Sequence, residues 1–128
     1  MFTTVRRLPV LCALLSCIIA MSRPASADNF GTSYYDRATN ELVVTVLYGG
    51  TNSNHRFRLK WGACEFDDSG RHLPLAVADM LDDQFNDAEH QQYTTVTRFS
   101  LADMPCPRPA KVQVSTSPGY SFELVIPK

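Results

Sequence analysis

The sequence is poor in the residues and motifs on which most recognisable enzymes depend. It contains six glycines and three histidines in 128 residues, and it lacks Gly-x-Ser-x-Gly, His-Glu-x-x-His and Ser-x-x-Lys. No glycine-rich loop is present to cradle a phosphate or a dinucleotide. No two histidines have the close spacing of a transition-metal site. We therefore expect no catalytic residues, no metal site and no cofactor, and a small secreted enzyme is the least favoured class.

The sequence also lacks an excess of positive charge. Its formal net charge is −1. Three of its 12 basic residues, Arg6, Arg7 and Arg23, precede residue 28, whereas all 13 acidic residues follow residue 27. The chain from residue 28 onward therefore carries a net charge of −4. This balance argues against binding to nucleic acid or to anionic membranes, because both require a basic surface.

Long apolar runs are missing as well, apart from one near the N-terminus. Residues 8–21 form a mostly apolar run that follows Arg6 and Arg7, and Ala25-Ser26-Ala27 offers small residues for cleavage. A membrane-spanning helix needs about 20 apolar residues, so this run is too short to span comfortably. We interpret residues 1–27 as a cleaved signal peptide and residues 28–128 as a single domain, periplasmic or secreted and most simply bacterial.

Two alternatives to cleavage after Ala27 stay open. The signal could remain as an uncleaved anchor. Leu14-Leu15-Ser16-Cys17 resembles a lipobox, in which lipidation of Cys17 would anchor the protein to a membrane. The apolar run continues through Ile18 and Ile19, whereas a lipoprotein usually becomes polar at that point. We therefore favour the ordinary signal peptide and expect no stable membrane insertion of the mature domain.

Only two cysteines, Cys64 and Cys106, would remain after cleavage. In an oxidising compartment, an isolated pair in a small domain is most simply a disulfide bond. The bond would close a loop of about 43 residues, for which loop-closure entropy predicts a stabilisation of about 4 kcal/mol.

The dominant hydrophobic period of the mature chain is two, which is typical of strands. Turn-forming residues separate the segments, and residues 104–110 form an extended, proline-rich connector. The segment 41–64 reads as a hairpin that turns at residues 49–54. We therefore expect an all-β fold, an antiparallel, immunoglobulin-like β-sandwich with one disulfide. The expected strands are 32–36, 41–48, 55–61, 93–101, 111–116 and 120–126.

The segment 73–92 fits two interpretations. Four residues lie at helical spacing: Val77, Leu81, Phe85 and Ala88. An alternating pattern competes with it, in which Leu73, Leu75 and Val77 lie on one side of a strand and Ala76, Ala78 and Met80 on the other. We favour a strand over 73–81 followed by an acidic loop over 82–92.

The stretch His55–Trp61 alternates four residues suited to an interior with three cations. We expect His55, Phe57, Leu59 and Trp61 to point inward, and His55 to be a partly buried, hydrogen-bonded residue at the start of the strand. Arg56, Arg58 and Lys60 would then point outward. Cations there suit an edge strand or an exposed face. They are also our candidate binding residues for an acidic partner.

The acidic residues suggest a second candidate site. Asp67-Asp68 and Asp82-Asp83, with Asn86, Asp87 and Glu89, supply oxygen ligands of the kind that calcium prefers. Their spacing does not match an EF-hand, so we favour a solvated acidic loop that promotes solubility.

One wider pattern carries a resemblance. Gly49-Gly50, His55-x-Phe57-x-Leu59-x-Trp61, Leu101 and Pro105-Cys106 together resemble a pattern found in small, uncharacterised exported bacterial proteins. The resemblance implies a β-rich exported domain and assigns no functional residue.

These observations favour a non-catalytic exported domain that binds a protein or a component of the cell envelope. The alternative is a carrier of a small molecule or lipid. Its cavity would lie between the sheets and be lined by Phe57, Trp61, Phe99 and Tyr120. The sequence does not indicate an oligomeric state.

Overall fold

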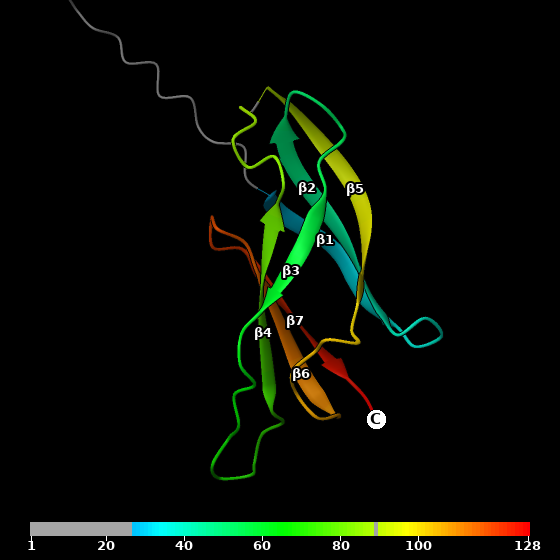
Figure 1. Ribbon diagram of the computed structural model, residues 1–128, viewed down its shortest axis with the longest axis vertical. Coiled ribbons are helices and arrows are strands. Elements are labelled where there is room, and N and C mark those ends of the chain that lie inside the picture. The colour runs from blue at the N-terminus through cyan, green and yellow to red at the C-terminus, as the bar shows by residue number, and fades with distance from the viewer. Residues whose placement is uncertain (1–26, 89) are drawn as a thin grey trace, which may run out of the picture.

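The computed structural model describes residues 27–88 and 90–128, so the predicted signal peptide lies outside the described residues except for Ala27. The described residues form seven strands and no helix (Figure 1). None of them forms a helix able to cross a membrane. The strands are β1 (Ala27–Asp36), β2 (Glu41–Gly50), β3 (Phe57–Trp61), β4 (Leu75–Asp82), β5 (Gln91–Ser100), β6 (Ala110–Ser115) and β7 (Ser121–Ile126).

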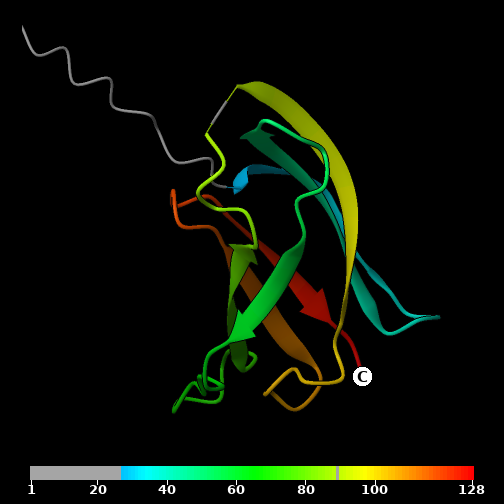
Figure 2. The ribbon, with the colours of Figure 1, turned by 45° about the horizontal axis from the view of Figure 1, so that its top comes forward.

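The strands form two sheets that pack on one core. One sheet has the order β1-β2-β5 and the other the order β3-β4-β6-β7. Figure 2 shows the two layers and the long arc of β5 along one side. Alternate residues of each strand supply the core, as the period of two requires. Fully or nearly fully buried residues come from both sheets and include Leu42, Val44, Val46, Ala76, Met80, Val112, Val114 and Ile126. The all-β prediction is confirmed.

The predicted hairpin over residues 41–64 is wrong. β2 pairs with β1 and β5, whereas β3 pairs with β4 in the other sheet. Residues 51–56 therefore cross from one sheet to the other, and we call them the crossover. The chain leaves the first sheet at Gly50, and hydrogen bonds that involve side chains hold the crossover from Thr51 to His55, before the β3–β4 ladder begins at Arg56.

The prediction of a purely antiparallel fold is also corrected. β4 and β6 pair in parallel, with Ala76 opposite Val112 and Ala78 opposite Val114. After β4 the chain passes to the other sheet as β5 and then returns as β6. Two passages between sheets bring the chain back beside β4 in the same direction, which a single hairpin turn cannot do.

The favoured reading of residues 73–92 is confirmed. β4 ends at Asp82, and the next strand begins at Gln91. Ala76, Ala78 and Met80 face the core, so the strand alternation applies and the helical spacing was fortuitous.

The alternation of the stretch 55–61 is confirmed, although the strand proper begins at Phe57. Phe57, Leu59 and Trp61 are partly buried and pack against the core. His55 is buried, with an exposed fraction of 6%. Arg58 and Lys60 are exposed, and β3 lies at an edge of its sheet, as cations at these positions suggested.

Candidate functional site

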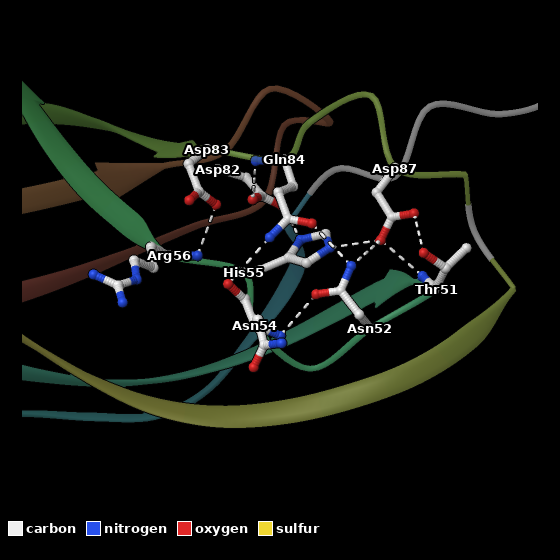
Figure 3. A network of polar contacts seen from close by, with 9 residues as sticks. All are labelled: Thr51, Asn52, Asn54, His55, Arg56, Asp82, Asp83, Gln84 and Asp87. Carbon is white, nitrogen blue, oxygen red and sulfur yellow. Dashed lines mark hydrogen bonds and ion pairs between the residues drawn. The ribbon is translucent and has the colours of Figure 1, made fainter.

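The most unusual feature of the molecule is a buried histidine held between two carboxylates. His55 Nδ1 lies 2.6 Å from Asp82 Oδ2, and His55 Nε2 lies 2.8 Å from Asp87 Oδ2 (Figure 3). The His55 side chain has no exposed surface, whereas the Asp82 and Asp87 side chains are 2% and 12% exposed. We call these three residues the clasp, because they join the crossover to the end of β4 and to the loop that follows it.

Apolar and close-packed groups surround the imidazole. Tyr48 on β2 stacks on the ring at a centroid distance of 4.7 Å, and Tyr93 on β5 stacks on Tyr48. Gly50 leaves no room for a side chain. A Cβ atom there would lie 2.6 Å from Asp87 Oδ2 and 2.8 Å from His55 Nε2. The clasp therefore depends on the absence of a side chain at Gly50.

Further hydrogen bonds orient the Asp87 carboxylate. The backbone N–H and the hydroxyl group of Thr51 donate to it at 2.7 and 2.6 Å, and Asn52 Nδ2 donates at 3.2 Å. Gln84 accepts a hydrogen bond from Asn52 and donates one to the Asn54 carbonyl oxygen. The crossover is thus tied along its length to the loop after β4.

The charges of the clasp shift the acidities of its members. Burial opposes the charged imidazole, but hydrogen bonds and attraction from Asp87 and Asp82 outweigh it and raise the pKa of His55. Hydrogen bonds from Thr51 and His55 lower the pKa of Asp87 to about 2. Burial, together with the negative charge of Asp82, raises the pKa of the Tyr48 phenol.

The clasp has the composition of an acid–base pair, yet its geometry is that of a structural tie. Both ring nitrogens of His55 are occupied by carboxylates, so neither is free to accept a proton from a substrate. The Thr51 hydroxyl group binds Asp87 rather than the ring. Among residues 27–88 and 90–128, no group of three or more His, Cys, Asp or Glu side chains is arranged to hold a metal ion.

The three candidate binding cations lie along the edge of the second sheet. Arg56 ends the crossover, and its guanidinium group points away from the clasp (Figure 3). Its backbone N–H donates to Asp83 Oδ1 at 2.8 Å. Arg58 and Lys60 project from β3, opposite Leu81 and Asp79 of β4. Among the described residues, no carboxylate oxygen lies within 4 Å of any of the three cationic groups.

A disulfide bond lies beyond the other end of β3. Cys64 and Cys106 are bonded, which confirms the predicted pairing. Cys106 lies in the connector between β5 and β6. In the same connector, Arg108 donates to Tyr35 Oη at 3.0 Å and to Asn40 Oδ1 at 2.6 Å. The connector is therefore joined both to the segment after β3 and to the β1–β2 turn.

The residues proposed for a carrier cavity do not all line one space. Phe57, Trp61 and Phe99 pack in or against the common core. Tyr120 is 48% exposed. It lines an open pocket of about 230 Å³ together with Asn29, Leu47, Tyr48 and Gln92.

Sequence reasoning identified His55 as a hydrogen-bonded residue but missed its partners. Asp82 was assigned to a solvated acidic loop, whereas it is 8% exposed and ends β4. A signal was present, because Asp82 is in step with Ala76, Ala78 and Met80 on the inward face. A buried carboxylate needs a partner, and His55 is in step with the inward face of β3. Asp87, in an irregular loop, gave no such signal.

Comparisons with known proteins do not assign a family. No family model, curated protein or solved structure matches the chain.

Proposed function

We propose that the chain is the precursor of an exported, non-catalytic domain that binds an acidic, extended segment of a protein or cell-envelope component through edge strand β3. The observation that carries the proposal is the row of exposed cations at Arg56, Arg58 and Lys60. No carboxylate among the described residues pairs with them, although the mature chain is acidic overall. A cationic row on an acidic domain favours acidic partners at this position.

The backbone of β3 supports the same proposal. Gly62 donates to the Val77 carbonyl oxygen, and Asp83 donates to the Arg56 carbonyl oxygen. Because antiparallel ladders alternate, Arg58 and Lys60 direct their backbone groups toward β4. The backbone groups of Phe57, Leu59 and Trp61 then point to the open edge. An extended segment could add as a strand there and place alternate carboxylates about 5 Å from Arg58 and Lys60.

Export is part of the proposal. The signal-like residues 1–27 support it, and so does the Cys64–Cys106 disulfide, because such bonds persist in oxidising compartments. The same features support a periplasmic or secreted location and the resemblance to small exported bacterial proteins. Seven strands in sheets of three and four support an immunoglobulin-like description of the sandwich, from which the parallel β4–β6 pair departs.

A peptide-binding measurement tests the proposal. The protein, purified after export from cells that express the full chain, would be titrated with a ten-residue peptide that alternates glutamate and threonine. We expect shifts of the β3 amide resonances, weaker binding in high salt, and at least about tenfold weaker binding for Arg56→Ala/Arg58→Ala/Lys60→Ala.

Two controls separate a site from simple charge attraction. Arg71→Ala/Lys111→Ala/Lys128→Ala removes the same net charge from other elements and should bind as the unmodified protein does. A peptide with glutamine in place of glutamate should bind weakly. Equal losses in the two triple variants, or resonance shifts that avoid β3, would reject the proposal.

A further inference from the structure

The geometry of the clasp sets its proton content. An ionised carboxylate only accepts hydrogen bonds, and a neutral imidazole has a single N–H to donate. His55 lies within hydrogen-bond distance of one carboxylate at each nitrogen, at 2.6 and 2.8 Å. A neutral ring between two ionised carboxylates offers one N–H for two acceptors. Both contacts are therefore favourable only when the three groups together hold one additional proton. The structure therefore describes the protonated form of the clasp.

We propose that His55, Asp82 and Asp87 form a proton-operated clasp, which fastens the His55 ring to the loop after β4 in acidic solution and releases that loop from the ring as the pH rises. The charged and titratable groups around the ring come from three sides. Asp82 lies at the end of β4 and Asp87 in the following loop. Tyr48 on β2 covers the ring face, with Tyr93 of β5 behind it. Among these described neighbours no second cation faces the ring, so its proton alone offsets the two carboxylates.

The link that opens is the one to Asp87. After loss of the proton, the remaining N–H can serve one carboxylate, and Asp82 is the shorter and more buried contact. The lone pair of Nε2 then faces the Asp87 carboxylate, which repels it. Asp87 retains its hydrogen bonds from Thr51, and its side chain already reaches solvent. The Asp87 loop and the N-terminal half of the crossover would therefore separate together from the ring.

The direction of the switch follows from two acidities. The pKa of His55 is raised above its ordinary value of about 6.5, so the clasp is protonated below that value and opens above the raised pKa. Asp87, with a pKa of about 2, remains ionised throughout this range. The clasp is thus closed below pH 6.5 and open above the raised pKa of His55.

The crossover ends at Arg56, the first cation of the proposed binding row. If β3 binds acidic segments, opening of the clasp frees the crossover next to that row and weakens binding at high pH. This consequence rests on the proposed function, whereas the clasp itself does not. The two are measured separately below.

The clasp is tested by NMR on the exported protein between pH 4 and 9. We expect the His55 ring to titrate above pH 6.5 and the amide resonances of Thr51 and Asp87 to shift over the same transition. In Gly50→Ala, whose new Cβ separates Asp87 from the ring, the His55 titration should move down. In His90→Gln, which alters an exposed histidine, both transitions should remain.

A His55 titration below pH 6.5, or an unchanged titration in Gly50→Ala, would overturn the clasp. Loss of peptide binding is read on the same samples. A titrating clasp with no peptide binding at any pH rejects the function of β3 and leaves the switch in place. Peptide binding without a clasp transition rejects the switch and leaves the function of β3 in place.

Discussion

Two ties of different chemistry lie at the two ends of β3. Before the strand, the His55 clasp joins the crossover to the loop after β4 through three ionisable side chains. After the strand, the Cys64–Cys106 disulfide joins the chain to the connector between β5 and β6. The first tie depends on a proton and the second on a covalent bond. The edge strand β3, which has one neighbour in its sheet, therefore has a tie at one end that pH can alter. The tie at its other end is a disulfide that only reduction can break.

Removal of the disulfide should have the largest effect. Cys64 and Cys106 are separated by 42 positions, and loop-closure entropy predicts that Cys64→Ala/Cys106→Ala loses about 4 kcal/mol of unfolding free energy. Urea unfolding measures the loss. Thiol titration of the unmodified protein is the control, since two free thiols in the folded state would contradict the bond.

Removal of the His55 ring, at the opposite end of β3, should have the second-largest effect on stability. His55→Ala leaves two carboxylates facing a buried space, and we expect a loss of about 3 kcal/mol near pH 5. Urea unfolding again reports it. Because β3 alone spans about 16 Å, the losses from this variant and from the cysteine variant should add to within about 0.5 kcal/mol. Strong coupling would show that the two ends act as one unit.

A pair of glycine variants separates the clasp from general packing. Gly50→Ala places a methyl group 2.6 Å from Asp87 Oδ2 and should cost about 2 kcal/mol. Gly62→Ala meets its nearest neighbour, the Val77 carbonyl oxygen, at an ordinary 3.6 Å and should change stability by less than about 1 kcal/mol. Thermal unfolding of both variants gives the comparison, and equal losses would show that the Gly50 position is not special.

The dependence of stability on pH should distinguish the two ties further. The raised pKa of His55 contributes stability that is complete below about pH 6.5 and lost as the pH rises through the raised value. The pKa of Asp87, lowered to about 2, contributes stability that is complete above pH 3.8 and lost as the pH falls toward 2. Urea midpoints should therefore decline on the alkaline side. This decline should be absent in His55→Gln and retained in the cysteine variant.

The smallest effects should come from the cations between the two ties. Arg56→Ala, Arg58→Ala and Lys60→Ala each remove an exposed side chain without a carboxylate partner among the described residues. Each should change the unfolding free energy by less than about 0.5 kcal/mol in urea. A loss above 1 kcal/mol for any of them would show a structural role and weaken their use as binding residues.

Prediction from sequence succeeded where a local rule applied. The alternation of Phe57, Leu59 and Trp61 predicted the inward face of β3. The alternation over residues 73–81 predicted the strand β4, but only the structure shows that Ala76, Ala78 and Met80 form its inward face. It failed where the same local pattern fits two topologies. The expected strands 41–48 and 55–61 with a turn between them read as a hairpin, yet the turn carries the chain to the other sheet. Nothing in the six crossover residues distinguishes these outcomes.

The sequence by itself determined most of the strands, the buried face of β3 and the disulfide, because each follows from spacing along the chain or from there being only two cysteines after residue 27. The tertiary structure decided the parallel pairing of β4 with β6, the passage between sheets at residues 51–56, and the partners of His55. Thirteen acidic residues were available to one buried histidine. The register of β3 against β4 brings Asp82 to His55, and the return of the loop over Gly50 brings Asp87 there. The sequence does not identify these partners, because a hydrogen bond depends on distance in space rather than on distance in sequence.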